Sequence, residues 1–578
     1  MPNRSKTAIS RVNEFGKDIL SAVDNELFCS VCTLKLDFTR KSSIEQHFKT
    51  ITHQKNVKKS AKKKAVGQLF LDSNADKIKE NLARDLLEAF TCANIPLNKL
   101  ENDSIKNLFE KYLPTNVPFP STSLVRKQIP VYYNEIFESI KVDIKNKKVA
   151  ILCDESTDSQ QRYFLQILCK VLDSFSNKAP YLLETIYLEK TNYKTVSQSV
   201  LKILAKFEIS LDNVYGFVTD NGSYMLKAYN SVLENVLPNS RHITCAAHII
   251  ALVADTWRKE LPKLDRLVSL IKFMFCKSPI RRSRYKTFLT EMNAGKVILP
   301  PEPVLTRWNT WFMAVTYHID YWSYLTTFVD DEIRLFSETE NLKDLLELLK
   351  NDELKKEAEL VSQNCEKFII LQQKFQGNSV LAPQVFNDFN ELYFWLEAKK
   401  DDFKDDIKIL RLFERSQAKL KFYLFDNGMP SMNLFKSSRF LDPRQFRYFE
   451  KDFDKLSMDI PELRDAKEEW LLYLDLIKEL NFEVSFDLNQ FWLSNKKKFG
   501  KLFEISQWLL YYPNNSADCE RSISIYNKIL TDDRNRLTQE SLVYLNFIYF
   551  NQKNGLKAND DASLNDTSEN DCILIEQD

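Results

Sequence analysis

Glycine is scarce in this chain of 578 residues, which has 9 glycines against 40 phenylalanines and 23 tyrosines. Because glycine favours turns and aromatic side chains fill cores, this composition predicts a helix-rich globular protein. An excess of one charge is also missing, since 81 Lys and Arg residues balance 80 Asp and Glu residues. The net charge therefore indicates no partner, and only the local distribution of charge can do so.

Long apolar runs are missing as well. The sequence has no N-terminal apolar segment of signal-peptide type and no run of 18 apolar residues, so we expect neither secretion nor a membrane span. The ten cysteines are scattered, and only Cys29 and Cys32 form a close pair. This pattern fits one metal site in a reducing compartment better than a disulfide framework. The length predicts roughly three or four folded units.

The close cysteine pair begins a pattern of metal ligands. Cys29 and Cys32 are followed, after fourteen residues, by His47 and His53. Two thiolates and two imidazoles at this spacing can surround Zn²⁺ tetrahedrally. The alternative is two unrelated cysteines and two surface histidines. Because ligand type, order and spacing agree, we predict a zinc finger.

Apolar and basic residues between these ligands support a finger that binds DNA. Phe38 and Ile44 can form the small core that such a finger needs. Arg40, Lys41 and Lys49 lie on or near the helix that leads to the histidines, where a finger meets DNA.

Polar segments flank the predicted finger on both sides. We expect residues 1–25, which are polar, to be mobile. Residues 54–64, QKNVKKSAKKK, include Lys58 and Lys59 and have no apolar periodicity. This run is either a solvated linker or an arm that contacts phosphates and directs nuclear import, and the two interpretations are compatible. We therefore expect a nuclear protein.

Several short motifs occur in register in the N-terminal part of the chain. They are Asn3-Arg-Ser-Lys-Thr-Ala, Arg11-Val-x-Glu-Phe-Gly, Leu27-Phe-Cys-x-x-Cys and Arg40-Lys-Ser-x-Ile. Together they resemble CGG triplet-repeat-binding proteins, which are small DNA-binding factors with a finger similar to the BED type. The resemblance covers roughly the first fifth of the chain.

Two apolar runs in the middle of the chain end in aspartate. Residues 149–153 precede Asp154, and residues 214–219 precede Asp220. Short unbroken apolar runs are typical of strands that are buried on both faces. A carboxylate at the end of such a strand lies at the rim of the sheet, where it can bind a metal. The alternative, that both aspartates only cap turns, is common.

The segments between these aspartates indicate a particular sheet. Apolar runs at 163–172 and 181–188 are separated by short connections, which predicts an antiparallel meander. A helix over 195–207 then leads to the strand before Asp220. This order is that of a ribonuclease-H-like sheet, in which the first and fourth strands are neighbours. Asp154 and Asp220 would then lie side by side.

Four separated motifs follow from residue 242 onwards. They are His242-Ile-Thr-Cys245-Ala-Ala-His248, Thr306-Arg307-Trp308-Asn-Thr, Asn515-Ser-Ala-Asp-Cys-Glu520-Arg521-Ser-Ile and Arg534-Asn-Arg536-Leu-Thr. In their order they resemble the hAT family of DNA transposases, and the resemblance covers about three quarters of the chain. It implies a ribonuclease-H-like mixed sheet interrupted by a large all-α insertion, and a C-terminal dimerisation region. By this resemblance the family's catalytic Asp, Asp and Glu correspond to Asp154, Asp220 and Glu520, which would hold Mg²⁺ or Mn²⁺.

Two of these motifs contain candidate DNA contacts. Cys245 and His248 could be half of a second metal site, but no second cysteine is close, so a packed core pair is the favoured interpretation. The resemblance implies a position near the DNA end. Arg307 and Trp308 could stack on an extruded base and neutralise phosphate, although Trp308 could also belong to a core.

The C-terminal segment contains an apolar stripe and a polar tail. Glu520 is expected at the start of an amphipathic helix, and Leu542 and Leu545 belong to a stripe that we expect to form a homo-oligomer. Residues 552–578 are polar and acidic, and we expect them to be disordered. The apolar triplet within 571–576 is either without function or a strand that a ubiquitin-like modifier binds.

The expected class is a multidomain α+β protein with a small N-terminal zinc finger. The expected function is metal-dependent phosphodiester cleavage and strand transfer on transposon ends in the nucleus, with double-stranded DNA as the partner. The alternative is a domesticated transcription regulator that binds DNA without cleaving it. The expected segments are a finger with a basic arm (1–66), a helical region (67–145), the first part of the sheet domain (146–258), the all-α insertion (259–500), the last part of the sheet domain with the dimerisation region (501–551) and the tail (552–578).

Overall fold

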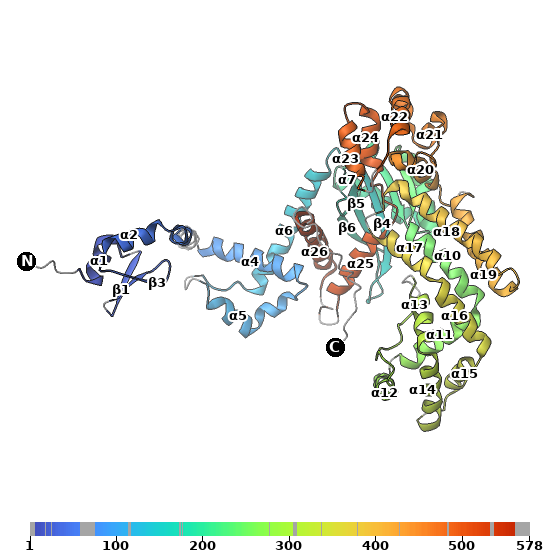
Figure 1. Cartoon of the computed structure of the whole chain (residues 1–578), viewed down its shortest axis with the longest axis horizontal. Coiled ribbons are helices and arrows are strands. Elements are labelled where there is room, and N and C mark those ends of the chain that lie inside the picture. The colour runs from blue at the N-terminus through green and yellow to red at the C-terminus, as the bar shows by residue number, and fades with distance from the viewer. Residues whose placement is uncertain are drawn as a thin grey trace, which may run out of the picture. The chain divides into compact units, whose positions relative to one another are not determined.

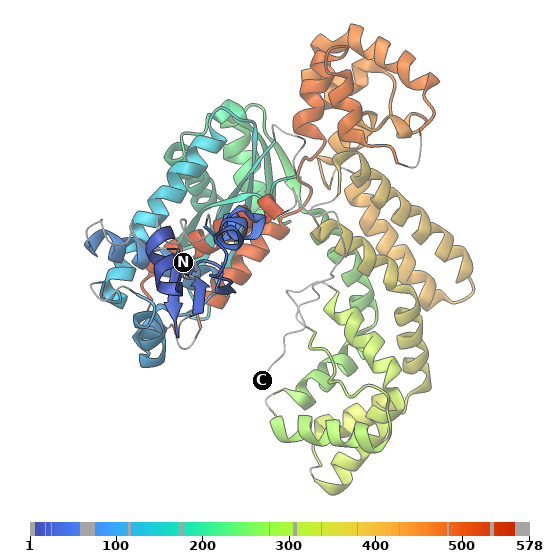
Figure 2. The same ribbon diagram turned by 60° about the vertical axis from the view of Figure 1, so that its left-hand side comes forward.

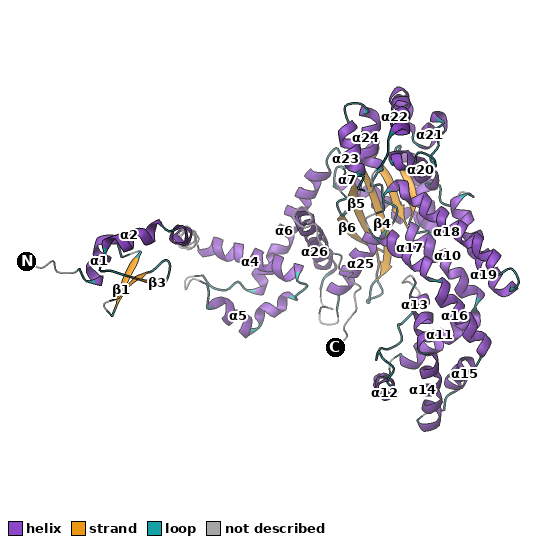
Figure 3. Cartoon of the chain, in the orientation of Figure 1, coloured by secondary structure: helices purple, strands orange, loops and turns teal. Residues whose placement is uncertain are grey.

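The computed structural model shows a mixed α+β protein that is mostly helical, with a three-stranded and a five-stranded sheet (Figure 3). This confirms the predicted α+β class. The chain divides into two compact units, residues 1–132 and 133–578 (Figure 1). The described residues are 6–17, 19–24, 26–57, 75–113, 117–172, 175, 177–276, 278–303, 309–336, 338–377, 380–426, 428–482, 485–531, 534 and 537–560.

The first unit begins with a small domain built on the three-stranded sheet. Its core contains Ala8 and Val12, which follow helical spacing, and Ile44 of the helix that carries His47. Residues 8–15 are therefore helical, and the expectation that residues 1–25 are mobile is wrong there. The elements are α1 (Ala8–Phe15), β1 (Leu20–Val23), β2 (Glu26–Cys29), β3 (Leu34–Leu36) and α2 (Lys41–Lys49).

Helices follow in the rest of the first unit. The last of them contains Pro130. Val125, Ile129 and Tyr132 are buried on both sides of this proline, and their burial offsets the hydrogen bond that proline cannot donate. The helices are α4 (Ala75–Cys92), α5 (Asp103–Glu110) and α6 (Thr122–Ile144), with a 3₁₀ turn at Leu97–Glu101, and α6 continues beyond residue 132 into the second unit.

The five-stranded sheet has the order β6-β5-β4-β7-β8. The first three strands form the predicted antiparallel meander, and β4 pairs in parallel with β7, so the predicted neighbours are confirmed. The short strand β8 was not predicted, and it extends the sheet in parallel beside β7. The elements are β4 (Val149–Thr157), β5 (Tyr163–Val171), β6 (Tyr181–Leu188), α7 (Tyr193–Lys206), β7 (Val214–Thr219), α8 (Ser223–Ala228), a π-helical turn (Tyr229–Leu233), α9 (Glu234–Val236) and β8 (Arg241–Thr244).

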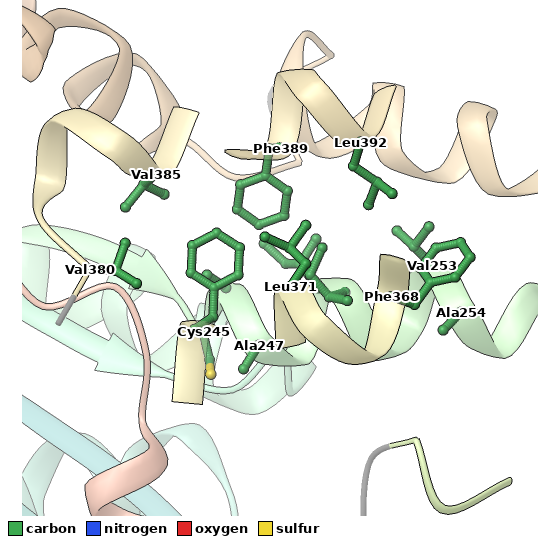
Figure 4. Close-up of a cluster of buried hydrophobic side chains, with 14 of the residues drawn as sticks. Cys245, Ala247, Val253, Ala254, Phe368, Leu371, Val380, Val385, Phe389 and Leu392 are labelled. Carbon is green, nitrogen blue, oxygen red and sulfur yellow. The ribbon is translucent and has the colours of Figure 1, made fainter. Parts of the chain in front are cut away.

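A long helical region begins directly after β8 and extends from the sheet in green to orange (Figure 2). Its buried side chains join it to the sheet through the first helix, α10. Figure 4 shows Ala247 and Val253 of α10 among Leu371, Phe389 and Leu392 from later helices. The helices are α10 (Ala246–Glu260), α11 (Pro262–Phe275), α12 (Pro279–Glu291), α13 (Thr310–Asp320), α14 (Trp322–Leu335), α15 (Glu340–Leu349), α16 (Asp352–Asn364), α17 (Glu366–Gln376), α18 (Ala382–Asp402), α19 (Ile407–Leu424), α20 (Met432–Ser437), α21 (Phe453–Asp459), α22 (Lys467–Glu479), α23 (Leu488–Asn495) and α24 (Gly500–Leu509).

The chain then returns to the sheet in α25 (Ala517–Ile529) and α26 (Gln539–Asp560). Helix α25 packs on β4 and β5, and α26 packs on β6. The side chain of Asn551 accepts a hydrogen bond from the backbone N–H of Leu182 at 2.9 Å and donates one to the same residue's carbonyl at 3.0 Å. The prediction of disorder from residue 552 is wrong as far as 560, because α26 continues to that residue. The apolar triplet within 571–576 lies outside the described residues.

The C-terminal apolar stripe does not form a free surface. Leu542 is fully buried and Leu545 is 7% exposed, because α26 packs against the chain's own sheet. The prediction that these two leucines form the oligomer surface is therefore wrong. None of the helices in the described ranges has the length and apolarity that a membrane span needs.

Replacing Leu542 with Asp is expected to unfold the protein rather than dissociate an oligomer. A carboxylate at this buried position would lower the free energy of unfolding by at least about 3 kcal/mol. Urea unfolding measures this loss. The matched control is Val142→Asp, at a position that is 72% exposed on α6, and it should change stability by less than about 0.5 kcal/mol. If Leu542→Asp left the free energy of unfolding unchanged and halved the mass of the particle in solution, the packing of Leu542 against the chain's own sheet would be contradicted.

Candidate functional site

The four predicted zinc ligands come together in the N-terminal domain. Their ligand atoms all lie within 4.8 Å of one another. The Nδ1 atom of His53 lies 3.5 Å from Cys29 Sγ, 3.4 Å from Cys32 Sγ and 3.1 Å from His47 Nε2. A tetrahedral site with bonds of about 2.0–2.3 Å has ligand-to-ligand distances of about 3.3–3.8 Å. The geometry therefore fits a zinc ion.

The basic residues of this domain are not equivalent. Arg40 and Lys49 are exposed at the two ends of α2, where a DNA backbone could reach them. The Lys41 Nζ atom instead lies 3.2 Å from Glu14 Oε1. Hydrogen bonds from Lys6, Arg11 and Lys41 hold the pKa of Glu14 down to about 2. Lys41 thus has a partner within the domain, which the sequence did not reveal. The predicted contacts Lys58 and Lys59 lie outside the described residues.

The two predicted aspartates lie at one edge of the five-stranded sheet. Leu152 of β4 pairs with Val218 of β7, so Asp154 and Asp220, each two residues further on, project on the same side. Strand β4 continues past Asp154 to Thr157, so this aspartate lies within the strand rather than at its end. Strand β7 ends directly before Asp220, whose Oδ1 accepts a hydrogen bond from the Gly222 N–H at 3.0 Å.

Glu520 lies in the first turn of α25, the helix that packs on β4 and β5. Burial, and then the charges of Asp220 and Glu520, raise the pKa of Asp154 well above its ordinary value. Burial, followed by the Cys245 thiol, raises the pKa of Glu520 to about 7. The Oε1 atom of Glu520 is buried and has no hydrogen-bond partner among the described residues. A cation would relieve this repulsion and supply the missing partner.

Hydrogen bonds that the sequence did not predict hold α25 against the sheet. The Tyr526 hydroxyl donates to Asp158 Oδ2 at 2.9 Å and lies 2.8 Å from the Tyr187 hydroxyl. The Ser522 hydroxyl donates to Gln166 Oε1 at 2.5 Å. These contacts join β5, β6 and the residue that follows β4 to one helix, and they fix the position of Glu520 relative to the sheet.

Cys245 and His248 lie at the N-terminus of α10, beside the carboxylates. The Cys245 thiol is fully buried and accepts a hydrogen bond from the Ser516 N–H at 3.4 Å. It therefore packs in the core, as the favoured interpretation predicts, and it offers no surface to DNA. His248 is half-buried, and its charge offsets a small part of the rise in the pKa of Asp154 and of Glu520. Arg307 and Trp308 lie outside the described residues.

Two tyrosines hold the loop that carries Asp220. The Tyr224 hydroxyl donates to Glu155 Oε1, so it joins this loop to β4. The side-chain amide of Asn221 donates to the Tyr423 hydroxyl at 3.0 Å, which joins the loop to α19. Neither contact was predicted, because each depends on a side chain far away in the sequence.

Comparisons with known proteins place these features in families. The CGGBP1 N-terminal domain matches residues 3–59, the ZMYM1/FAM200 RNase-like domain matches 95–231, and the hAT family C-terminal dimerisation region matches 469–551. CGG triplet repeat-binding protein 1 of Homo sapiens is 30% identical over 138 residues, which cover 22% of this chain and 81% of that protein. The protein of the same name from Mus musculus gives the same values.

Two segments of the chain are therefore similar to an RNase-like domain and to the hAT family C-terminal dimerisation region. By its N-terminal part, the chain belongs to the family of CGG triplet repeat-binding protein 1. Both resemblances stated from the sequence are confirmed. The match to a dimerisation region supports an oligomer.

The raised pKa of Glu520 predicts how stability depends on pH. Below about pH 4.5 the carboxyl group is protonated in both the folded and the unfolded state, so its ionisation does not lower the free energy of unfolding. As the pH rises towards 7, the unfolded state loses the proton first, so the free energy of unfolding falls. Above about pH 7 the full cost of roughly 3 kcal/mol is present.

Glu520→Gln removes this cost. We expect the variant to be more stable than the wild type at pH 8 by up to about 3 kcal/mol and equally stable at pH 4. Urea unfolding of zinc-loaded protein in buffer without other divalent ions measures both values. Glu504→Gln, at an exposed position on the adjacent α24, is the control and should have the pH dependence of the wild type. If the free energy of unfolding of Glu520→Gln and that of the wild type changed with pH in the same way, the burial of the Glu520 carboxyl group would be contradicted.

Proposed function

We propose that this protein carries out DNA transposition chemistry of the hAT type, which is metal-dependent cleavage and strand transfer at transposon ends. One observation carries the proposal. The parallel pairing of β4 and β7 brings Asp154 and Asp220 to one sheet edge, and α25, whose first turn carries Glu520, packs on β4 and β5. In this proposal two strands and one helix, far apart in sequence, supply the three carboxylates of one site.

The strand order supports a ribonuclease-H-like domain. Three antiparallel strands are followed by two parallel strands on the β4 side, and the helical region enters between β8 and α25. In this proposal residues 146–258 and 501–551 form the catalytic domain, and residues 259–500 are its insertion. The match of residues 95–231 to an RNase-like domain supports this assignment.

Asp154, Asp220 and Glu520 fit hard divalent cations such as Mg²⁺ or Mn²⁺, because all three offer carboxylate oxygens. When bound, the ions would activate water or a DNA 3′-hydroxyl for attack on a phosphodiester. The chain's own residues position the carboxylates. Tyr526 fixes α25 and therefore Glu520, and Tyr423 holds the loop of Asp220 through Asn221.

The N-terminal domain would recognise double-stranded DNA. Zinc held by the two cysteines and two histidines would fix α2, which presents Arg40 and Lys49 to the backbone. A protein that acts on chromosomal DNA would work in the nucleus. Oligomer formation would bring two sets of carboxylates to the two ends of one element.

A second candidate is a regulator that binds DNA without cleaving it. It is favoured by the printed name of the relative, CGG triplet repeat-binding protein 1, whose match covers the N-terminal part of this chain. In that case the finger and the oligomer would act, and the carboxylates would be idle.

A cleavage assay distinguishes the two candidates. The substrate is duplex DNA taken from the two genomic flanks of the gene, where transposition predicts short inverted repeats, and the full chain is supplied with zinc and Mn²⁺. Transposase chemistry predicts nicks at the repeat boundary that depend on Mn²⁺. Binding to the repeats without nicks would favour the regulator.

A further inference from the structure

Helix α19 leads along α10 to the loop that carries Asp220. Near its start, Arg411 forms an ion pair with Glu260 at the end of α10, with Nε and Oε2 3.0 Å apart. In its middle, the hydroxyl oxygens of Ser416 and Thr256 lie 2.8 Å apart. At its end, the Tyr423 hydroxyl accepts the hydrogen bond from Asn221. The two helices therefore run antiparallel, and the C-terminal end of α19 lies beside the carboxylate site.

One face of α19 carries a row of cations that ends in an aromatic ring. Lys408, Arg411, Arg415, Lys419 and Phe422 follow one another at intervals of three or four residues, so they share one face of the helix. We call this set the α19 stripe. The side chains of its first three members are 59%, 56% and 57% exposed, although each has an acidic partner. The stripe is thus an exposed basic track that points towards Asp220.

The last two members of the stripe are arranged differently from the others. Lys419 forms no ion pair with another residue in the described part of the chain. Its Nζ atom lies 5.8 Å from the centroid of the Phe422 ring and 5.4 Å from that of Tyr423. A cation over aromatic rings is held in place and keeps its charge available to a phosphate.

The ring of Phe422 is exposed and yet fixed. It is 46% exposed. The chain turns back after α19, and the Gly428 N–H donates to the Phe422 carbonyl at 2.9 Å. A Cβ atom at Gly428 would lie 2.4 Å from the ring, so only glycine permits this close approach. One side of the ring is therefore backed by backbone, while the ring remains accessible to a ligand.

We propose that Phe422 and Lys419 form a stacking platform for a single DNA strand that leaves the Asp220 end of the carboxylate site. A base would stack on Phe422, its phosphate would pair with Lys419, and the next phosphates would follow Arg415 and Arg411. Base stacking on an aromatic ring beside a basic track is the general mode of binding to single strands. Charge complementarity favours a nucleic acid over an apolar partner, because the four cations of the stripe outnumber the two carboxylates, Glu357 and Glu260, that pair with them. The α19 segment lies outside the three segments that match known families.

This inference rests on the proposed function, because it assumes a DNA strand in the carboxylate site. The test uses the full zinc-loaded chain with Mn²⁺ and a single-stranded oligothymidylate that contains one 5-iodouracil. Irradiation should crosslink the base to the peptide that contains Phe422, as mapped by mass spectrometry. Phe422→Ala should remove this crosslink and weaken binding of the oligonucleotide about ten-fold, whereas Phe422→Trp should restore binding. Lys419→Ala should reduce the slope of log affinity against log salt by about 0.7.

Two matched variants control for general effects. Phe394→Ala removes a ring that is 60% exposed on α18, and Lys421→Ala removes an exposed cation on another face of α19. Neither should change the crosslink or the affinity.

The platform would be overturned if Phe422→Ala bound the oligonucleotide as tightly as the wild type. It would also be overturned if Phe394→Ala lost as much affinity as Phe422→Ala. The wild type could nick the flanking DNA of the cleavage assay while Phe422→Ala binds single strands as tightly as the wild type. In that case the platform fails and the proposed function stands. A crosslink at Phe422 without any nicking supports the platform and counts against cleavage.

Discussion

Asp154→Asn is expected to abolish DNA cleavage while making the metal-free protein more stable. The substitution removes a metal ligand at nearly constant shape, and we expect a loss of at least roughly a thousand-fold in rate, or about 4 kcal/mol of transition-state stabilisation. At the same time it removes a buried carboxylate that Asp220 and Glu520 repel. Asp220→Asn and Glu520→Gln should have the same effect on cleavage.

The two effects are measured separately. Nicking of duplex DNA with the element's own ends, in Mn²⁺, gives the rate, and urea unfolding without free divalent ions gives the stability. Added Mn²⁺ should stabilise the wild type and have little effect on the three variants. The matched control is Asp212→Asn, at an exposed position before β7, which should retain both activity and stability. Full activity in Asp154→Asn would exclude these carboxylates as the metal site.

Removal of zinc is expected to unfold the N-terminal domain and leave the second unit folded. The core of this domain is small, whereas zinc binding at comparable sites contributes about 10–16 kcal/mol. Without the ion, the two thiols and two imidazoles would surround an empty centre, and folding would lose its largest favourable contribution. DNA binding by the domain should disappear with the fold.

Amide dispersion of a fragment of residues 1–66, with and without a chelator, measures this effect. The fragment must include α1, because Ala8 and Val12 are buried in the core. Cys29→Ser and His53→Ala should resemble the chelated wild type. In the full chain, Cys276→Ser, which replaces an exposed thiol on another element, should bind DNA normally. Equal dispersion with and without the chelator would show that the four residues hold no structural metal.

Local patterns in the sequence predicted the parts of the fold that depend on few residues. The run before Asp154 and the run before Asp220 predicted two strands, and the order of segments between them predicted that these strands are neighbours. The ligand spacing predicted the Cys/His cluster in the same way. These features depend on periodicity and spacing, which a single sequence contains.

Other features depend on contacts between distant segments and could not be predicted from local patterns. The stripe with Leu542 has the same periodicity whether it faces its own sheet or a second copy, and only the structure shows that it is buried. The contact of Tyr526 with Asp158 positions Glu520, yet neither residue has a distinctive neighbourhood in the sequence. Helix α1 was missed because its short apolar pattern is surrounded by polar residues.

The hydrogen bond from Ser522 to Gln166 spans 356 residues of sequence, and this distance matters during translation. A ribosome releases the N-terminal domain and all five strands of the large sheet long before it makes Glu520. If the protein has the proposed function, nascent chains and products of premature termination before α25 would contain the DNA-binding domain but only two of the three carboxylates. We expect such products to compete with the full-length protein for its sites without cutting them. Early termination would thus yield an inhibitor of the protein rather than an uncontrolled nuclease.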